Sequence, residues 1–448
     1  MFYFLEKMNY SFSFFNLFYK IYYTDFKNIE DNELDELKIL IIDNGSISIK
    51  FMQWYISKLI NTDEDPEKYK KIINKFSDIF DNCPFHSDSD SYEIFEKDFG
   101  FDLDKIIKKN SIKRIASGSI GQVYRATLID GREIAIKVKH PYVDNLKNNQ
   151  MYFINLLTQL QKYSYIRNNT GIFIDIEDFM ENLNLQLDFK NEAFNSLIFS
   201  KNLKNNNRVI IPKVFYYSNN IIISEFKDGY YFHEIKNNYK RKKIAINFLC
   251  FNLESSIFNN FMHADLHSRN WKVEEDDKNS KIIIYDFGLC FRSISVENNI
   301  KVWESFQKVD LYKLLEEKEY FVEGNLDLLT YDDIKELNNL KKERFGMNIL
   351  MKRMRKIFIK KNLKIKKNFM NLIIWITLIE DMIRETGCFI RKEYESDETQ
   401  HQRATIIAYC NTNRAYDKVK AYYTNLYNKN TLTDFFNTEN CGLVFDEI

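Results

Sequence analysis

The spacing of apolar residues divides the first part of the chain into a leader and a helical segment. Residues 1–35 are rich in aromatic side chains, and 36–110 carry apolar residues every three to four positions, most regularly through 47–60 and 69–80. This spacing is typical of helices that bury one face. The polar run HSDSDS at 86–91 predicts a loop within the segment. We therefore expect an N-terminal helical extension behind an aromatic leader.

Short β-rich runs replace the helical pattern between 112 and 138, where they surround glycines. An Asp-Gly pair at 130–131 predicts a hairpin turn between two of these runs. A second alternating region, 209–226, has an Asn-Asn pair at 219–220 as its predicted turn. These runs predict a small lobe rich in strands over 111–230.

Helical periodicity marks most of the remaining chain. It covers 146–205, which is inserted into the small lobe, and about 239–261, and it continues from roughly 295 to the end. One predicted strand, 281–285, interrupts it. This order predicts an α+β fold in which a small β-rich lobe precedes a larger helical lobe, 231–448.

Composition excludes several classes of protein. Lys plus Arg (64) equals Asp plus Glu (64), so no overall charge favours a nucleic-acid partner. The six cysteines are scattered without a Cys-x-x-Cys pair, which indicates free intracellular thiols. The N-terminus lacks a signal-peptide pattern, the first arginine is Arg114, and no run reaches about 18 apolar residues. We expect an intracellular protein, cytoplasmic or peripheral to a membrane, without a mitochondrial presequence.

A loop of small residues lies between two predicted strands. It consists of Ile115, Ala116, Ser117, Gly118, Ser119, Ile120, Gly121, Gln122 and Val123. Small residues let backbone N–H groups approach phosphate oxygens closely, so the loop is a candidate nucleotide-binding element. An ordinary hairpin turn would have a similar sequence, and the loop alone does not separate the two interpretations.

Lys137 closes the next apolar run, sixteen positions after Gly121. A lysine at the end of a strand can direct its ammonium toward the loop and pair with phosphates. Because Ile136 and Val138 flank it on a buried strand, it needs an anion nearby, and Glu192 is the candidate. The alternative is a lysine at a strand edge in solvent.

The segment from His263 to Asn270 (HADLHSRN) is the strongest of the motifs. Asp265 and Asn270 stand five positions apart, as the catalytic base and a magnesium ligand do in a kinase catalytic loop. His263, Asp265 and His267 could instead bind zinc, although nothing else in the sequence supports a catalytic zinc site.

Asp286 begins an Asp-Phe-Gly tripeptide, directly after the predicted strand 281–285 and twenty-one positions beyond Asp265. A carboxylate at the end of a strand is suited to chelate magnesium between phosphates. The small-residue loop, the lysine, the HADLHSRN segment and this tripeptide follow in the order in which a kinase fold uses them. Together they predict ATP and magnesium as ligands.

These motifs resemble the UbiB-like, aarF-domain family of atypical kinases, which is linked to ubiquinone biosynthesis, over about 38–295. The small-residue loop ends Ser-Ile-Gly-Gln-Val, as in that family. Lys50 and Gln53 resemble the family's Lys-x-Gly-Gln signature. Gln186, Asp188 and Glu192 resemble its Glu-x-Asp…Glu segment. His263 and His267 resemble the two histidines of its His-x-Asp-Pro-His-x-x-Asn loop. The resemblance implies a two-lobed protein-kinase-like fold with a helical C-terminal region and an N-terminal helical extension that folds over the active site.

The chain departs from the family pattern at several positions. Gly118 stands where alanine is frequent, Met52 replaces the signature glycine, and Gln186 replaces the first acid of Glu-x-Asp. The last proline is Pro212, so the Ala-Pro-Glu element that anchors peptide substrates in ordinary protein kinases cannot follow Asp286.

A basic stretch, 352–367, holds nine Lys or Arg and no acid, and it precedes the apolar run 369–379. Such a combination can adsorb to an anionic membrane surface, so residues 352–379 are a candidate contact for a membrane partner. The alternative is a solvated basic face followed by a core helix.

The sequence thus predicts an atypical kinase or ATPase with an unidentified acceptor, for which a lipid-linked molecule is one candidate. Asp265, Lys137 and Glu192 are the expected catalytic residues, and Asn270 and Asp286 the expected magnesium ligands. One alternative is a nucleotide-binding regulatory module with negligible turnover, which the missing Ala-Pro-Glu element favours. Another is a small-molecule kinase of the aminoglycoside-phosphotransferase sort, which the Ser-Ile-Gly-Gln-Val loop opposes.

Overall fold

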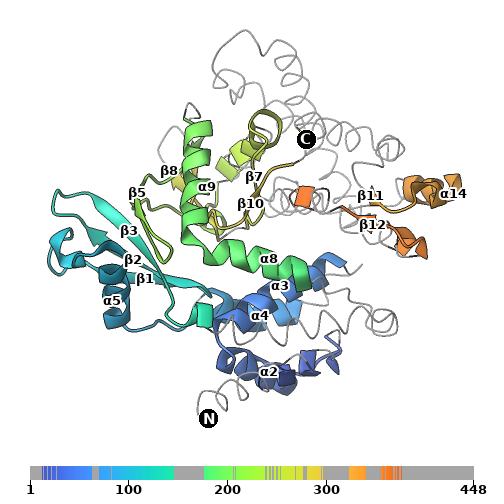
Figure 1. Ribbon diagram of the computed structural model, residues 1–448, viewed down its shortest axis with the longest axis horizontal. Coiled ribbons are helices and arrows are strands. Elements are labelled where there is room, and N and C mark those ends of the chain that lie inside the picture. Colours follow the sequence, from blue (N-terminus) through green and yellow to red (C-terminus); the bar gives the residue numbers. More distant parts are fainter. Residues whose placement is uncertain are drawn as a thin grey trace, which may run out of the picture. The chain divides into compact units, whose positions relative to one another are not determined.

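The computed structural model describes most of residues 13–145 and 176–295 with short gaps, together with 322–339 and parts of 354–375. The chain forms two compact units, one of 1–194 with 214–226 and the other of 195–213 with 227–448. Figure 1 shows the helices and strands along the chain.

The first unit contains a five-stranded antiparallel sheet in the order β1-β2-β3-β6-β5. Its strands are β1 Lys113–Ser117, β2 Gly121–Thr127, β3 Glu133–Lys139, β5 Val214–Tyr217 and β6 Ile221–Glu225. Both predicted hairpins are confirmed, and Gly131 supplies the positive φ (96°) that the tight turn at 130–131 requires. The strands place Lys137 in the third strand, paired on both sides.

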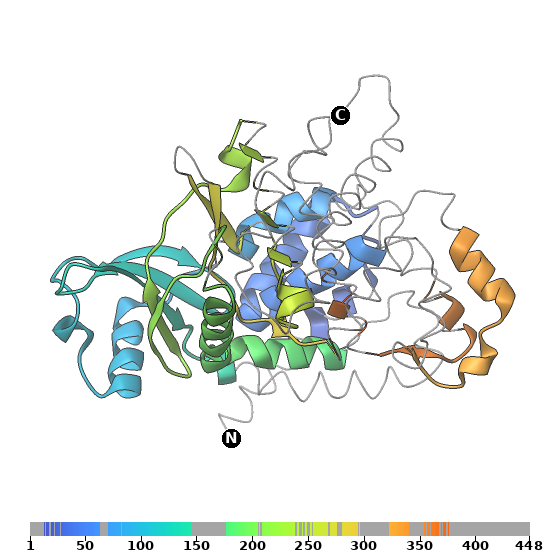
Figure 2. The ribbon, with the colours of Figure 1, turned by 90° about the horizontal axis from the view of Figure 1, so that it is seen from above.

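Helices cover the sheet and form a separate core in the same unit. They are α2 Asp31–Asp43, α3 Ser46–Thr62, α4 Lys70–Asp81, α5 Asp88–Phe99, α8 Ile176–Leu187 and the start of α9 Phe189–Asn202, with a 3₁₀ turn at Leu103–Lys105. Phe95 of α5 packs with Tyr124, Ile134 and Ile136 of the sheet, whereas α2, α3, α4 and α8 share their own apolar core. In Figure 2 α5 lies against the strands, away from α2–α4.

The predicted helical extension is confirmed for its described residues. The periodic runs at 47–60 and 69–80 correspond to α3 and α4. Leu17 and Ile21 of the aromatic leader are buried in the same core. Core packing therefore accounts for these two residues, whereas Phe15, Tyr19 and Tyr23 of the leader are exposed.

The predicted loop at 86–91 is wrong for its last four residues, because α5 begins at Asp88. The Ser87 hydroxyl caps the helix by accepting a hydrogen bond from Asp90 N–H at 3.1 Å. Acidic side chains in the first turn also favour the positive end of the helix dipole. The polar run is therefore a helix start, not a loop.

The second unit contains a three-stranded sheet in the order β4-β9-β8. The strands are β4 Val209–Ile210, β8 Trp271–Glu275 and β9 Ser280–Ile284, and a two-stranded pair joins β7 Met262–His263 to β10 Cys290–Phe291. The part of the alternating region before the 219–220 turn does not form one strand: β4 pairs with β9, and β5 belongs to the other unit. Pro212 separates them because it lacks the N–H that would continue a ladder.

The described residues of the predicted helix 239–261 are helical between 240 and 252 and continue into a π turn at Glu254–Phe258, but residues 259–261 are not helical. The prediction of helix throughout the C-terminal region is wrong in part. Helix α14 spans Tyr331–Asn339, but β11 Val322–Glu323 pairs with β12 Lys364–Ile365. Residues 296–321 and 376–448 lie outside the described part.

Most of the apolar side chains described within 352–379 are buried. Phe358, Phe369, Leu372 and Trp375 are all at most 3% exposed, and the Trp375 indole donates to Asn252 Oδ1 at 2.9 Å. This burial supports the core-helix alternative for the apolar run and leaves the exposed lysines as the surface of the segment. Within the described residues, no helix is long and apolar enough to cross a bilayer.

Candidate functional site

The small-residue loop connects β1 to β2 in the first unit. Gly118 N–H donates to Gly121 O at 3.0 Å, which closes a tight turn at the loop tip. Cys83 N–H donates to Ser117 O at 2.9 Å, so the chain before α5 runs beside the loop. The Ile120 side chain packs against the helical core and against the start of α9. The loop is thus supported on several sides.

The two glycines of the loop differ in what surrounds them. A Cβ built on Gly121 would lie 2.6 Å from Val138 O and 3.2 Å from Phe189 Cζ. A Cβ on Gly118 would meet only Gly121 O, at 3.8 Å, and its φ is not positive. Gly121 therefore allows a close backbone approach, whereas the space around Gly118 accepts a methyl group.

We expect Gly121→Ala to lower the free energy of unfolding by about 1–3 kcal/mol, because a backbone oxygen must move to make room. Gly118→Ala is the matched control and should leave stability unchanged or raise it by about 0.4–1 kcal/mol. Urea unfolding of the two variants measures the difference. Equal stabilities would contradict this account of the loop.

Lys137 and Glu192 form a bidentate ion pair inside the first unit. Lys137 Nζ lies 2.7 Å from each carboxylate oxygen, and the Glu192 side chain is only 6% exposed. Glu192 is on α9, whose first turn is capped by the Asp188 carboxylate accepting from Lys190 N–H at 3.0 Å. The Lys137 ammonium also lies 5.1 Å from the centre of the Phe189 ring. The anion that a buried lysine requires is thus Glu192.

The residues of the predicted signature lie on α3. Met52, which replaces the signature glycine, is fully buried in the helical core, while Lys50 and Gln53 are partly exposed. Burial raises the pKa of the Cys83 thiol to about 11, and the nearby Lys50 charge opposes that shift. Gln186, near the end of α8, is partly exposed.

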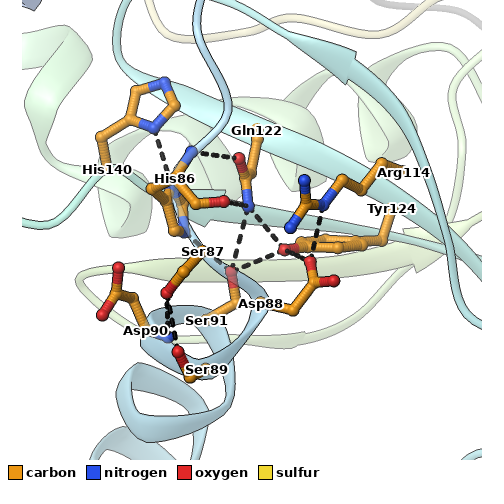
Figure 3. A network of polar contacts seen from close by, with 10 residues as sticks. All are labelled: His86, Ser87, Asp88, Ser89, Asp90, Ser91, Arg114, Gln122, Tyr124 and His140. Carbon is orange, nitrogen blue, oxygen red and sulfur yellow. Dashed lines mark hydrogen bonds and ion pairs between the residues drawn. The ribbon is translucent and has the colours of Figure 1, made fainter.

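Gln122 belongs to a buried polar network that the sequence did not reveal. Its side chain is fully buried, accepts from His86 N–H at 3.0 Å and donates to Tyr124 Oη at 2.5 Å and Ser91 Oγ at 3.2 Å (Figure 3). The network joins the start of α5 to β2 just beyond the loop. Because the Gln122 side chain is engaged in this network, any contact between Gln122 and a nucleotide would be made by its backbone.

The HADLHSRN segment in the second unit is held by hydrogen bonds among its own motif residues. Asn270 Nδ2 donates to Asp265 O at 2.7 Å, and Asp265 N–H donates to His263 Nδ1 at 3.1 Å. His263 Nε2 donates to Asp286 O. The structure thus brings Asp265, Asn270 and Asp286 together on one connected framework.

Both ring nitrogens of His263 are engaged with backbone groups, so neither is available to a metal. The ring is fully buried, and desolvation lowers its pKa, which keeps the imidazole neutral. His267 is exposed, and its Nδ1 accepts from Arg269 N–H at 3.4 Å. No cluster of three or more His, Cys, Asp or Glu that could hold a metal occurs among the described residues. These observations argue against the zinc alternative.

The Asp-Phe-Gly tripeptide is anchored from both sides. Gly288 N–H donates to Asp286 Oδ1 at 2.9 Å, and Asn195 Nδ2 donates to Phe287 O at 2.9 Å. The Phe287 ring is buried and its centre lies 5.3 Å from that of Phe199. The position of the Asp286 carboxylate is therefore set by packing as well as by the backbone.

The oxygens of Asn270 and Asp286 fit a hard divalent cation. Because the Asn270 amide nitrogen is committed to Asp265 O, the amide oxygen faces the other way and remains an acceptor. Amide and carboxylate oxygens are the ligands that magnesium takes from proteins. The residues present therefore suit magnesium, with the Asp265 carboxylate on the same framework.

Comparison with known proteins finds matches over the described motifs. A family model described as the ABC1 atypical kinase-like domain matches residues 78–317. A probable serine/threonine-protein kinase, abkC, from Dictyostelium discoideum is 30% identical over 250 residues, which are 54% of this chain and 35% of that protein. AarF domain-containing protein kinase 1 from Xenopus laevis is 25% identical over 233 residues, 50% of this chain and 44% of that protein.

The chain therefore spans between about a third and a half of the length of these two relatives. The solved complex of Rv3197 with erythromycin, from Mycobacterium tuberculosis, is 18% identical with a TM-score of 0.46, covering 72% of this chain and 87% of that one. The family match confirms the resemblance to UbiB-like, aarF-domain kinases. Because the family model covers more than half of the chain, this protein belongs to the ABC1 atypical kinase family and has its two-lobed, kinase-like α+β fold.

Proposed function

We propose that this protein is an ATP- and magnesium-dependent phosphotransferase or ATPase. The main support is the hydrogen-bonded framework that joins Asp265, Asn270 and Asp286 in the second unit. Phosphoryl transfer depends mostly on positioning and on charge, and needs few covalent steps from the protein. A fixed arrangement of oxygen-bearing side chains is what that chemistry uses.

Each motif has one role in the proposal. The loop 115–123 presents backbone N–H groups to the phosphates, and Lys137, oriented by Glu192, neutralises phosphate charge. Asn270 and Asp286 would hold magnesium, which supplies positive charge to the phosphate oxygens when bound.

Asp265 accepts a hydrogen bond from the attacking hydroxyl or water and orients it for attack. We propose a lipid-linked acceptor, for which the exposed lysines Lys356, Lys360 and Lys364 would provide attraction to an anionic surface.

Metal removal tests the proposal. We expect ATP to bind the wild-type chain in the presence of magnesium, and we expect EDTA or Asp286→Asn to weaken that binding at least about 10-fold, because the phosphate charge loses its counterion. Isothermal titration calorimetry measures the affinity. Asp327→Asn, an exposed carboxylate in the same unit, is the control and should behave as wild type.

Two results would redirect the interpretation. Binding that does not respond to magnesium would contradict the assigned metal ligands. Magnesium-dependent ATP binding without turnover would instead favour a nucleotide-binding regulatory module. Gln186, which replaces an acidic residue of the family pattern, supports that alternative.

A further inference from the structure

Two histidine rings from distant parts of the chain meet beside the small-residue loop. His86 Nδ1 lies 2.7 Å from His140 Nδ1, and the rings are nearly perpendicular, at 84°. At one end of this pair, His140 Nε2 lies 2.9 Å from Gly118 O. At the other, His86 Nε2 lies 2.7 Å from Ser91 Oγ. A continuous chain of hydrogen bonds therefore runs from α5 to the loop. Figure 3 shows the His86–His140 pair in this chain.

The hydrogen positions follow from the partners. A carbonyl oxygen only accepts, so His140 carries a hydrogen on Nε2. Burial lowers the pKa of both rings, that of His86 to about 4, so both are neutral at pH 7. Neutral His140 then accepts at Nδ1 from His86 Nδ1–H, and His86 Nε2 accepts from the Ser91 hydroxyl. One set of tautomers satisfies every contact in the chain.

His140 holds two carbonyl groups of the loop. Its side chain donates to Gly118 O, and its backbone N–H donates to Ile120 O at 2.9 Å. Since a peptide unit is planar and trans, fixing Gly118 O also directs Ser119 N–H to the opposite side. A loop that binds phosphate must present N–H groups and turn its carbonyl oxygens away, because those oxygens repel phosphate. His140 imposes this orientation on the loop.

The network behind the histidines is itself anchored. Tyr124 Oη donates to Asp88 Oδ1 at 2.8 Å, and Arg114 Nε donates to the same oxygen at 2.7 Å. Gln122 Nε2 donates to Ser91 Oγ at 3.2 Å, which leaves the Ser91 hydroxyl hydrogen for His86 Nε2. The first turn of α5 and strands β1 and β2 therefore give His86 a fixed position from which it supports His140.

We propose that His140 is a positioning residue for the nucleotide, holding the loop through Gly118 O and held in turn by His86. This inference rests on the proposed function, because it assigns the loop to the phosphates of ATP. His140 acts through the loop and does not touch the reacting atoms.

The test compares side chains that can and cannot donate a hydrogen bond at position 140, at pH 7.5. His140→Phe keeps a ring but removes the donor, and we expect the KM and the Kd for magnesium-ATP to rise about 3- to 10-fold, the usual effect of one hydrogen bond. The kcat should stay within about 2-fold, since the loop holds the ground and transition states alike. His140→Gln keeps a donor near the former Nε2 and should restore most of the affinity.

Ser111→Ala is the control. It removes side-chain hydrogen bonds with Lys108 O and Thr127 N at the other end of β2, and its Kd should match wild type. Wild-type affinity in His140→Phe would overturn the inference while leaving the proposed function intact. Equal loss in His140→Gln and His140→Phe would also overturn it, because the donor would then not matter.

A spectroscopic readout keeps the inference separate from ATP binding. In wild-type protein with ¹⁵N-labelled histidine, we expect His140 to be protonated at Nε2 and His86 at Nδ1, with a scalar coupling between the two Nδ1 nuclei. His140 protonated only at Nδ1 would overturn the inference even if ATP binds. A wild-type chain that shows the coupling but binds no ATP would overturn the proposed function, and the positioning role with it.

Discussion

Replacing Asp265 with asparagine is expected to reduce magnesium-dependent ATP turnover by about 10²- to 10⁴-fold, the range for loss of a general base. Asparagine has the same size but cannot accept a proton from the attacking group. The backbone contacts of this position, to His263 Nδ1 and from Asn270 Nδ2, do not involve the altered atoms. The substitution should therefore leave the framework and the proposed metal ligands, Asn270 and Asp286, in place.

Two measurements on the same sample make this result specific. Turnover measured by phosphate release should fall, while the Kd for magnesium-ATP from calorimetry should stay within about 3-fold, since Asp265 is not assigned to the metal. Asp327→Asn controls for a charge change elsewhere in the unit. Undiminished turnover in Asp265→Asn would rule out the role assigned to this carboxylate.

Lys137→Met is expected to lower the free energy of unfolding by about 3 kcal/mol, because it removes the ammonium that neutralises a buried carboxylate. The Glu192 side chain is 6% exposed, and each of its carboxylate oxygens accepts a 2.7 Å hydrogen bond from Lys137. The same substitution removes the ammonium proposed to contact phosphate. Stability and ATP affinity should therefore fall together.

A second substitution separates the two effects. Lys137→Met combined with Glu192→Leu replaces the ion pair with apolar side chains and should recover most of the stability, as such replacements are often near neutral. ATP affinity should not recover. Urea unfolding and calorimetry report the two quantities, and recovery of both would show that the pair has only a structural role.

Lys139→Met is the matched control on the same strand. Lys139 pairs with Asp144 at 3.2 Å, but that carboxylate is 55% exposed and water can solvate it when the lysine is removed. The free energy of unfolding should fall by no more than about 1 kcal/mol in Lys139→Met. If Lys139→Met lowered the free energy of unfolding as much as Lys137→Met does, burial of Glu192 would not explain the large effect of Lys137→Met.

Motifs with a fixed local spacing could be predicted from the sequence. The hairpin at 130–131, the strand that carries Lys137 and the segment from Asp265 to Asn270 all depend on neighbours within a few residues. The pairing of Lys137 with Glu192 was also predictable, because a lysine on a buried strand needs an anion.

Features that depend on contacts between distant parts of the chain could not be predicted from the sequence. His86 and His140 are far apart in sequence, and neither has a local pattern that predicts a partner, so their pair arises only from packing beside the loop. Gln122 was assigned to the loop, but its buried side chain faces α5. The Ser-Asp-Ser-Asp run read as a loop because polar residues suit loops and helix starts equally, and only the cap at Ser87 separates the two.

The most direct test of a magnesium-dependent phosphotransferase is a turnover assay on the purified wild-type chain with ATP labelled at the γ-phosphate. Reactions with magnesium and with EDTA, each with and without anionic vesicles, follow the label into free phosphate, protein or lipid. We predict magnesium-dependent release or transfer of the label that EDTA abolishes. Absence of both label release and ATP binding in the presence of magnesium would contradict the central claim.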